Sequence, residues 1–350
     1  MIYPSFEEAE KILASGDYKI IPISRELYSD CITPIEVMRI LKNVSKHCYM
    51  LESVDSSQKW GRYTFLGYDP TLEVTCYDHL LRIRSGMTME KKVEHPKDAI
   101  REILKDYKSP KLSHLPSFTG GLVGYFSYDY IKYSEPGLVL NAEDEEKFKD
   151  VDLMLFDKVI AFDHFRQKII LIVNAKAEFF ETEYNKAVNE LDNMAKLIRH
   201  GKPVENKSLQ IKNGFQPLFT KEEYCGMVEK AKHYIREGDI FQVVLSNRLE
   251  AEIGGSLFDT YRVLRTLNPS PYMFYFPVMM WKLPEHLRRH WSNWKMESYI
   301  PILLQEPGQE EKPRKRIRDW KKSFLRMKKN GRNTICWWIL EEMTLAGSVR

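Results

Sequence analysis

The character of the chain changes abruptly after Phe276. Six of its seven tryptophans lie at or beyond Trp281, and residues 278–350 hold 16 Lys and Arg against 8 Asp and Glu. The first 277 residues hold 37 Lys and Arg against 41 Asp and Glu. Such a change at one point raises the question of whether the two parts share one history. We therefore interpret them separately, because a folding pattern found in the first part need not continue into the second.

Length and composition indicate a globular protein. A chain of 350 residues can form one large domain or two smaller ones with a sizeable core. No apolar run approaches the roughly 20 residues needed to span a bilayer, and the first residues lack the features of a signal peptide. The five cysteines are odd in number and widely spaced, which is typical of reduced thiols. We expect a cytoplasmic protein with no membrane association, and the acidic first part gives no reason to expect nucleic-acid binding.

Hydrophobic periodicity predicts many strands with helices between and beside them, which indicates an α+β fold. Helices are expected at 1–18, from 34, at 96–107, 178–198, from 221, and at 256–264. Strands are expected at 18–23, 49–53, 60–67, 72–77, 80–84, 120–128, 153–163, 168–173, 240–246 and 272–276. The polar, unpatterned stretch 200–217 reads as a linker.

Helix boundaries carry clear signals at two of these positions. Thr33 and Glu36 fit the N-cap and third position of one helix, and Thr220 and Glu223 fit those of another. Gly238 is placed to end the second helix.

Four segments could carry chemistry, although each also has a plain structural interpretation. Glu52-Ser53 puts a carboxylate and a hydroxyl at a strand end. The glycines of 120–125 favour close backbone packing over a phosphate loop, because no nucleotide-binding spacing fits. Gln242 lies in a nearly all-apolar strand, where a buried amide would be a structural clamp or a substrate contact. Pro269 and Pro271 give a rigid turn into the strand that follows.

Together these segments resemble one family. The resemblance is carried by Leu51-Glu52-Ser53, Trp60-Gly61-Arg62-Tyr63, Gly120-Gly121-Leu122-Val123-Gly124-Tyr125, Gly238-Asp239-Ile240-Phe241-Gln242-Val243-Val244-Leu245-Ser246 and Pro269-Ser270-Pro271-Tyr272-Met273. Their order and spacing are similar to those of anthranilate synthase component I, a chorismate-utilising enzyme. The resemblance covers about residues 5–277. It implies two large, mostly antiparallel sheets packed as a sandwich with flanking helices. It also implies an N-terminal region at 1–200 and the start of a chorismate-binding domain at 218–277.

The resemblance implies an activity and its partners. The family converts chorismate and ammonia to anthranilate and pyruvate, the first step of tryptophan biosynthesis, with ammonia supplied from glutamine by an amidotransferase subunit, component II. It uses Mg²⁺, a hard cation that takes oxygen ligands. By motif match, Ser53, Pro271, Tyr272 and Met273, with Glu52 beside them, would contact L-tryptophan as a feedback inhibitor.

Gln242 is a candidate active-site strand residue. Isochorismate-forming relatives carry a lysine there that activates water. A neutral amide cannot be that base, which favours amination over hydration.

The family's catalytic and metal-binding segments follow the strand that ends near Phe276, and none is present here. They look like Ala-Gly-Ala-Ser-Pro-Glu, Ala-Gly-Thr-Arg and Glu-His-x-Met-Leu-Val-Asp-Leu-x-Arg-Asn-Asp. We predict no intact catalytic or metal-binding residues in this tail, and a missing C-terminal part of the fold.

The genetic code explains the tail as a shifted reading frame. In this interpretation, each codon of the original frame consists of the last base of one codon of the printed chain and the first two bases of the next codon. Because tryptophan has a single codon, Cys336-Trp337-Trp338-Ile339 then forces Leu-Val-Asp. Read in the same shifted frame, the codons of the neighbouring residues permit the rest of the family segment, as Glu-His-Asn-Met-Leu-Val-Asp-Leu-Gly-Arg-Asn-Asp. The same shift lets 284–289 read Ala-Gly-Ala-Ser-Pro-Glu and 305–308 read Ala-Gly-Thr-Arg. We therefore interpret 278–350 as an out-of-frame, non-native segment.

Three alternatives stay open at this point. The first is aminodeoxychorismate synthase component I or another chorismate-utilising enzyme. Aminodeoxychorismate synthase often carries a lysine where the shifted codon at Gln305 can encode only Ser, Pro, Thr or Ala. A non-catalytic, tryptophan-binding remnant is a second alternative. Nucleic-acid binding by the basic runs 312–318 and 321–329 is a third, and random out-of-frame coding explains those runs better. We predict that the chain as written does not turn over chorismate and is poorly soluble.

Overall fold

The computed structural model describes residues 2–53, 61–135, 137–138, 147–205, 207–270 and 272–276. These residues belong to one compact unit, Met1–Ser298. The tail from 278 and Pro271 lie outside the described residues. The predicted boundaries at 1–200, 218–277 and 278–350 stay predictions.

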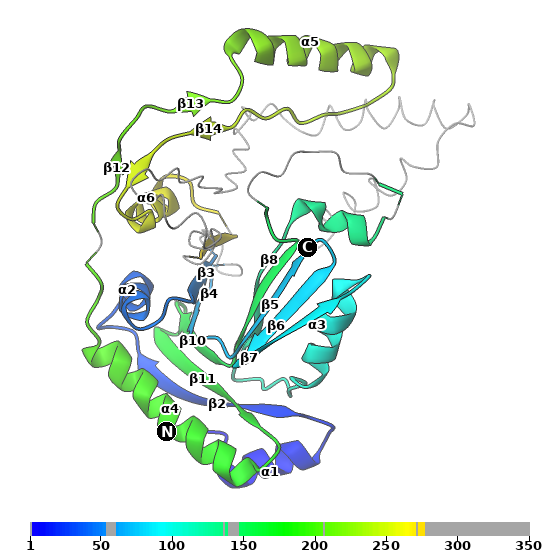
Figure 1. Cartoon of the computed structure of the whole chain (residues 1–350). Helices are drawn as coiled ribbons and strands as arrows, with labels where there is room; N and C mark the ends of the chain where they lie inside the picture. Colours follow the sequence, from blue (N-terminus) through cyan, green and yellow to red (C-terminus); the bar gives the residue numbers. More distant parts are fainter. Residues whose placement is uncertain are drawn as a thin grey trace, which may run out of the picture. The chain divides into compact units, whose positions relative to one another are not determined.

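A seven-stranded antiparallel sheet forms the centre of the described chain (Figure 1). Its order is β1-β2-β11-β10-β4-β3-β16. The strands are β1 (Ile2–Tyr3), β2 (Ile20–Tyr28), β3 (Cys48–Glu52), β4 (Tyr63–Tyr68), β10 (Lys158–Asp163), β11 (Lys168–Lys176) and β16 (Met273–Tyr275). Both faces of β10 and β11 are buried, and each strand has an unbroken apolar run at its centre, residues 159–162 and 169–173.

Helices cover one face of this sheet. They are α1 (Phe6–Ala14), α2 (Pro34–Val44), α4 (Phe180–His200) and α6 (Phe258–Leu267). Alternate residues such as Ile169 and Leu171 pack into their shared core, whereas Ile170 and Ile172 point to the opposite face. In Figure 1, α4 lies along β11 and β2. Thr33 caps α2 as predicted, and its hydroxyl accepts a hydrogen bond from the Glu36 amide at 3.3 Å.

A second antiparallel sheet has the order β7-β6-β5-β9-β8. Its strands are β5 (Leu72–Tyr77), β6 (Leu80–Ser85), β7 (Met87–Lys92), β8 (Gly121–Phe126) and β9 (Val151–Phe156). The helix α3 (Pro96–Lys105) and the 3-10 helix η1 (Tyr128–Tyr133) pack against it. The two sheets meet through Tyr49 and Phe156, whose ring centroids are 4.7 Å apart. The predicted α+β fold with two antiparallel sheets is therefore confirmed.

The run 153–163, predicted as one strand, is two strands in different sheets. β9 belongs to the second sheet and β10 to the first, with Asp157 between them. The Asn174 side chain binds the turn there, because its amide donates to the carbonyl oxygens of Asp157 and Thr119. Both strands are buried, so the hydrophobic pattern alone does not reveal the switch.

The remaining elements are short strands and one long helix. Two-stranded ribbons pair β12 (Gln210–Ile211) with β15 (Ile253–Gly254) and β13 (Gln216–Pro217) with β14 (Leu249–Glu250). Between them, α5 (Lys221–Glu237) begins at a complete capping box of Thr220 and Glu223 and ends at Gly238 in the left-handed region. Both predicted ends of this helix are confirmed. The region predicted as a structureless linker therefore contains β12 and β13.

A buried carboxylate fixes the turn between β10 and β11. The Asp163 side chain accepts hydrogen bonds from Arg62 Nε and Nη2 at 3.1 and 2.7 Å and from the amides of Phe165 and Arg166, both at 3.1 Å. Burial raises the pKa of Asp163, but the Arg62 guanidinium and the two amides outweigh it, so the pKa lies below its usual value.

This pKa predicts a pH-dependent loss of stability. A carboxyl group with a depressed pKa stabilises the fold above its unfolded pKa, roughly 3.9, and loses that contribution as the pH falls through the folded value. Asp163→Asn should lower the free energy of unfolding by about 2 kcal/mol at pH 7, and the difference should shrink below about pH 4. Urea unfolding at several pH values measures it. Asp259→Asn, which removes a partly exposed pair with Arg262, is the control and should cost under about 1 kcal/mol. An equal cost for the two variants would contradict the prediction.

Candidate functional site

Two predicted site segments, far apart in sequence, lie on adjacent strands. β16 pairs with β3 in antiparallel register, so Met273 is opposite Glu52, and Tyr275 is opposite Met50. Ser53 follows directly after β3, and Tyr272 directly precedes β16. The structure thus brings Glu52, Ser53, Tyr272 and Met273 together at one end of the strand pair. Pro271 lies outside the described residues.

Glu52 is a buried carboxylate held by two residues of α6. Its side chain accepts hydrogen bonds from the Tyr261 hydroxyl at 2.6 Å and from Arg265 Nη2 at 2.7 Å. A buried charge requires such partners. Burial raises the pKa of Tyr261, and the charge of Glu52 raises it further, so the phenol stays a hydrogen-bond donor.

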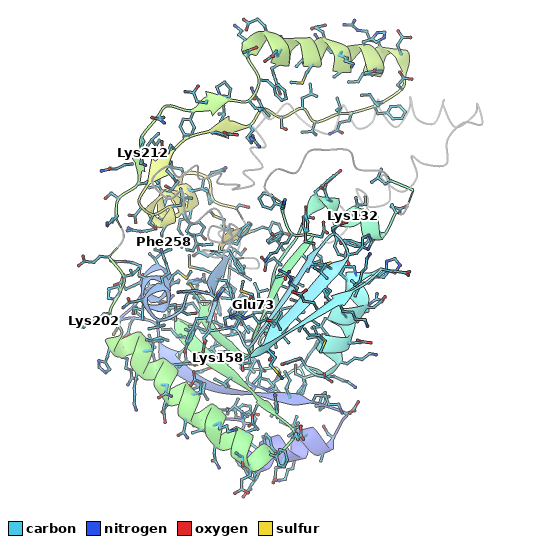
Figure 2. All side chains as sticks on the ribbon, in the orientation of Figure 1. Glu73, Lys132, Lys158, Lys202, Lys212 and Phe258 are labelled. Atoms are coloured by element: carbon cyan, nitrogen blue, oxygen red, sulfur yellow. The ribbon has the colours of Figure 1, made fainter. Side chains whose placement is uncertain are left out.

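An aromatic cluster holds α6 against the strand pair. Phe258 and Tyr261 both contact the Tyr275 ring, with centroid distances of 4.8 and 5.4 Å. The Lys42 ammonium lies 4.8 Å from the centre of the Phe258 ring, which Figure 2 labels. Tyr261 therefore takes part in both contacts: its ring packs on Tyr275, and its hydroxyl joins Arg265 at Glu52.

A histidine lies in the turn directly after β10. Thr64 is opposite Glu52 on β4, and its hydroxyl is 2.8 Å from His164 Nε2. Burial lowers the pKa of His164, although the charge of Glu52 raises it in part. The neutral imidazole and the Thr64 hydroxyl extend the polar group around Glu52 to the turn after β10.

Two buried polar atoms in this cluster lack partners within the described residues. They are the hydroxyl oxygen of Ser53 and Nε of Arg265. Buried polar groups are normally hydrogen-bonded.

The structure around Gln242 differs from the prediction. The segment 240–246 is not a strand in the described structure, and the Gln242 side chain is exposed. A strand that is apolar on both faces forms only between neighbouring strands. In the described part of the chain no strand pairs with this segment, so the predicted buried amide is wrong for this structure.

The described residues contain no candidate metal site. No group of three or more His, Cys, Asp or Glu side chains there could hold a metal ion. The predicted absence of intact metal-binding residues concerns the tail from 278, which lies outside the described residues. Within the described part, no helix is both long and apolar enough to cross a bilayer.

Comparison with known proteins decides the family. A model described as chorismate binding enzyme matches residues 46–283. The chain belongs to the chorismate-binding enzymes. It is 39% identical over 284 residues to anthranilate synthase component 1 of Acetivibrio thermocellus and 37% identical over 284 residues to that of Aquifex aeolicus. These alignments cover 79% and 77% of this chain but only 57% and 55% of the relatives.

A solved structure supports the same relationship. Anthranilate synthase component I from Streptococcus pneumoniae is 31% identical and superposes with a TM-score of 0.51, covering 71% of this chain and 54% of that one. The predicted resemblance is therefore confirmed. Because the chain spans little more than half the length of these relatives, activity, partners and effectors of a whole enzyme remain to be argued.

Sequence reasoning missed the two partners of Glu52. Tyr261 and Arg265 are separated from it by 209 and 213 positions. One signal was available, because residues four apart lie on the same face of a helix. A tyrosine and an arginine at that spacing in an otherwise apolar helix face could have been matched to the buried glutamate.

Proposed function

We propose that the gene encodes anthranilate synthase component I, which converts chorismate and ammonia to anthranilate and pyruvate. The ammonia would come from glutamine through an amidotransferase subunit, component II, and the location would be the cytoplasm. The observation that carries the proposal is the match of residues 46–283 to chorismate-binding enzymes, together with relatives that bear this name. The shifted codon at Gln305 favours it over aminodeoxychorismate synthase, because that codon cannot encode lysine.

The chain as written is proposed to be inactive. The family match ends at residue 283, close to the change in composition at 278. The shifted reading of the tail contains the segments that the family uses for Mg²⁺ and substrate, whereas the printed residues do not. Restoring the frame by one base near codons 276–279 should therefore create the activity.

The test compares the printed chain with the frame-restored chain. Both are assayed with chorismate, ammonia and Mg²⁺, and anthranilate is measured by its fluorescence. The restored chain should be active and should lose its activity in EDTA, whereas the printed chain should stay at background. Anthranilate formation by the printed chain would disprove its inactivity, and a folded restored chain of the relatives' full length without activity would disprove the assignment.

We propose further that the end of the β3–β16 pair binds L-tryptophan as a feedback inhibitor. Support comes from the register that places Glu52 and Ser53 beside Tyr272 and Met273 and from the unpartnered hydroxyl of Ser53. That hydroxyl would bind an end of the amino acid, and the ion pair with Arg265 would hold Glu52 in place beside it.

Inhibition of the restored chain by L-tryptophan tests this site. Ser53→Ala should raise the inhibitory concentration at least about tenfold, the loss of one good hydrogen bond in a buried site, with little change in KM for chorismate. Ser208→Ala, which alters an exposed serine, serves as the control. Equal inhibition of all three chains would exclude Ser53 from the site. For the printed chain, calorimetry with L-tryptophan tests whether a binding remnant persists, and an absence of heat would count against it.

A further inference from the structure

The strand β7 (Met87–Lys92) lies at one edge of the second sheet (Figure 1). Its inner side pairs with β6, where Ile83 is opposite Met89. Its outer side has no partner strand within the described chain, and all six of its residues are exposed. An unpaired edge of this kind can pair with a strand from another chain. The outer side of β7 is therefore a candidate interaction surface.

Alternate residues of β7 carry the main-chain groups of this outer side. The Val93 amide donates to the His79 carbonyl at 2.9 Å, directly beyond the β6–β7 ladder. Hydrogen-bonded and non-hydrogen-bonded pairs alternate along an antiparallel ladder. Counting back from this pair, the N–H and C=O groups that point to β6 belong to residues 87, 89 and 91. Those that point outward belong to Thr88, Glu90 and Lys92.

An apolar stripe is open at the same edge. Paired residues of neighbouring strands lie on one face of a sheet, so Met89 shares a face with Ile83, and Met87 continues that stripe. On this face Leu81 and Ile83 belong to the core cluster that includes residues of α3. Met87 and Met89, however, are 87% and 65% exposed. The apolar face of the sheet therefore extends beyond its cover, and side chains of a further strand would lie beside the two methionines.

The sequence of β7 is complementary to itself. Two identical edge strands related by a two-fold axis perpendicular to the sheet pair antiparallel, and one residue then faces its own copy across the axis. With Met89 on the axis, Thr88 is opposite Glu90 of the other copy, and Met87 is opposite Lys91. No like charges face each other in this register. The outward main-chain groups of Thr88 and Glu90 also meet, as a hydrogen-bonded pair requires.

The other symmetric registers are less favourable. An axis at Glu90 would place two carboxylates opposite each other, and an axis at Lys91 or Lys92 would do the same with two ammonium groups. Like charges directly opposite on neighbouring strands are destabilising. An axis at Thr88 would pair only residues 87–89, because the turn at Gly86 comes directly before the strand. Charge and strand length therefore favour the register with Met89 on the axis.

We propose that two copies of this chain associate through β7, so that their second sheets join into one sheet around a two-fold axis at Met89. Thr88 and Glu90 of the two copies exchange main-chain hydrogen bonds, and the Met89 side chains meet across the axis. One strand pair buries less surface than the roughly 1,200 Å² of a stable interface, so the dimer is weak and depends on concentration. The association involves no substrate and is independent of the proposed enzyme activity.

Disulfide cross-linking of the full 350-residue chain tests this register. Cys31, Cys225 and Cys336 are first replaced by serine, because the first two are exposed and the third lies outside the described residues. Met89→Cys should then form a disulfide-linked dimer on mild oxidation in lysate, seen on a non-reducing gel. The two Cα atoms of such a non-hydrogen-bonded pair are about 4.5 Å apart, within the range that a disulfide spans. Dilution of the lysate should reduce the dimer.

Met87→Cys is the matched control. It changes the same residue type on the same face of β7, at a more exposed position. In the proposed register the two copies of residue 87 are four positions apart along the strands, about 13 Å, which is too far for a disulfide. Met87→Cys should therefore cross-link at least about tenfold less than Met89→Cys. Adding Thr88→Asp to Met89→Cys should lower the yield at least about threefold, because it faces Glu90 of the other copy, whereas Thr88→Lys should not lower it.

Any other result overturns the inference. Equal cross-linking of Met87→Cys and Met89→Cys would mean random collision or aggregation of chains with exposed thiols. The absence of a Met89→Cys dimer would mean that β7 stays unpaired or that another part of the chain covers it. Equal yields with Thr88→Asp and Thr88→Lys would mean that residue 88 does not face Glu90 of a second copy.

Discussion

Arg265→Ala is expected to lower the free energy of unfolding by about 3 kcal/mol, because it leaves the carboxylate of Glu52 buried without its cation. The Glu52 side chain is only 2% exposed, and Arg265 Nη2 lies 2.7 Å from its oxygen. The Tyr261 hydroxyl would remain as a partner, but a neutral donor compensates less than a charged one. The loss should be measured by pulse proteolysis in lysate, which does not require a soluble purified sample.

Two further variants separate the ion pair from other effects of removing a side chain. Arg262→Ala removes an exposed arginine of the same helix, which pairs with Asp259, and should cost under about 1 kcal/mol. Adding Glu52→Gln to Arg265→Ala removes the buried charge and should recover part of the stability. If Arg265→Ala costs no more than Arg262→Ala, or if the double variant is no more stable than the single one, the buried pair does not act as described.

The sequence predicted most of the architecture because local rules decide it. The capping residues Thr33 and Thr220 and the helix stop at Gly238 require only neighbouring positions, and all three are confirmed. Strands with regular patterns, such as β5 at Leu72–Tyr77, were found at their observed bounds. The strand β7 was missed because all six of its residues are exposed, and an edge strand without a buried face has no alternation to detect.

The site could be predicted only in part, because it depends on contacts between distant residues. The resemblance grouped Glu52 and Ser53 with Tyr272 and Met273, and the register of β3 and β16 agrees with that grouping. Arg265 and Tyr261 were missed because their role depends on how α6 packs. The prediction that Gln242 is buried in a strand was wrong for a related reason. The apolar pattern around it describes a strand between neighbours, and the described chain does not provide them.

Gly124→Ala is the second substitution with a large expected effect. A Cβ atom at Gly124 would lie 2.0 Å from the Asp152 carbonyl oxygen and 2.8 Å from Leu153 Cα, both of which are backbone atoms of the adjacent strand β9. Because backbone atoms cannot move aside as a flexible side chain can, β8 would have to separate from β9. We expect a loss of about 3 kcal/mol in the free energy of unfolding, at the upper end of the usual cost of overpacking. This agrees with the predicted role in close backbone packing for Gly124, whereas a Cβ at Gly121 would meet nothing within 4 Å.

The matched control for Gly124→Ala is Gly226→Ala on α5. A Cβ there would meet nothing within 4 Å, and alanine is favoured over glycine in a helix by about 1 kcal/mol. The two substitutions add the same methyl group, so they should shift stability in opposite directions when measured by the same proteolysis assay. Because no residue of α5 is buried, its gain should appear as slower cleavage within the helix, whereas the loss from Gly124→Ala should appear as faster cleavage of the sheets. If Gly124→Ala were tolerated as well as Gly226→Ala, β8 and β9 would be further apart than described, and the interpretation of the glycine motif as a packing device would be wrong.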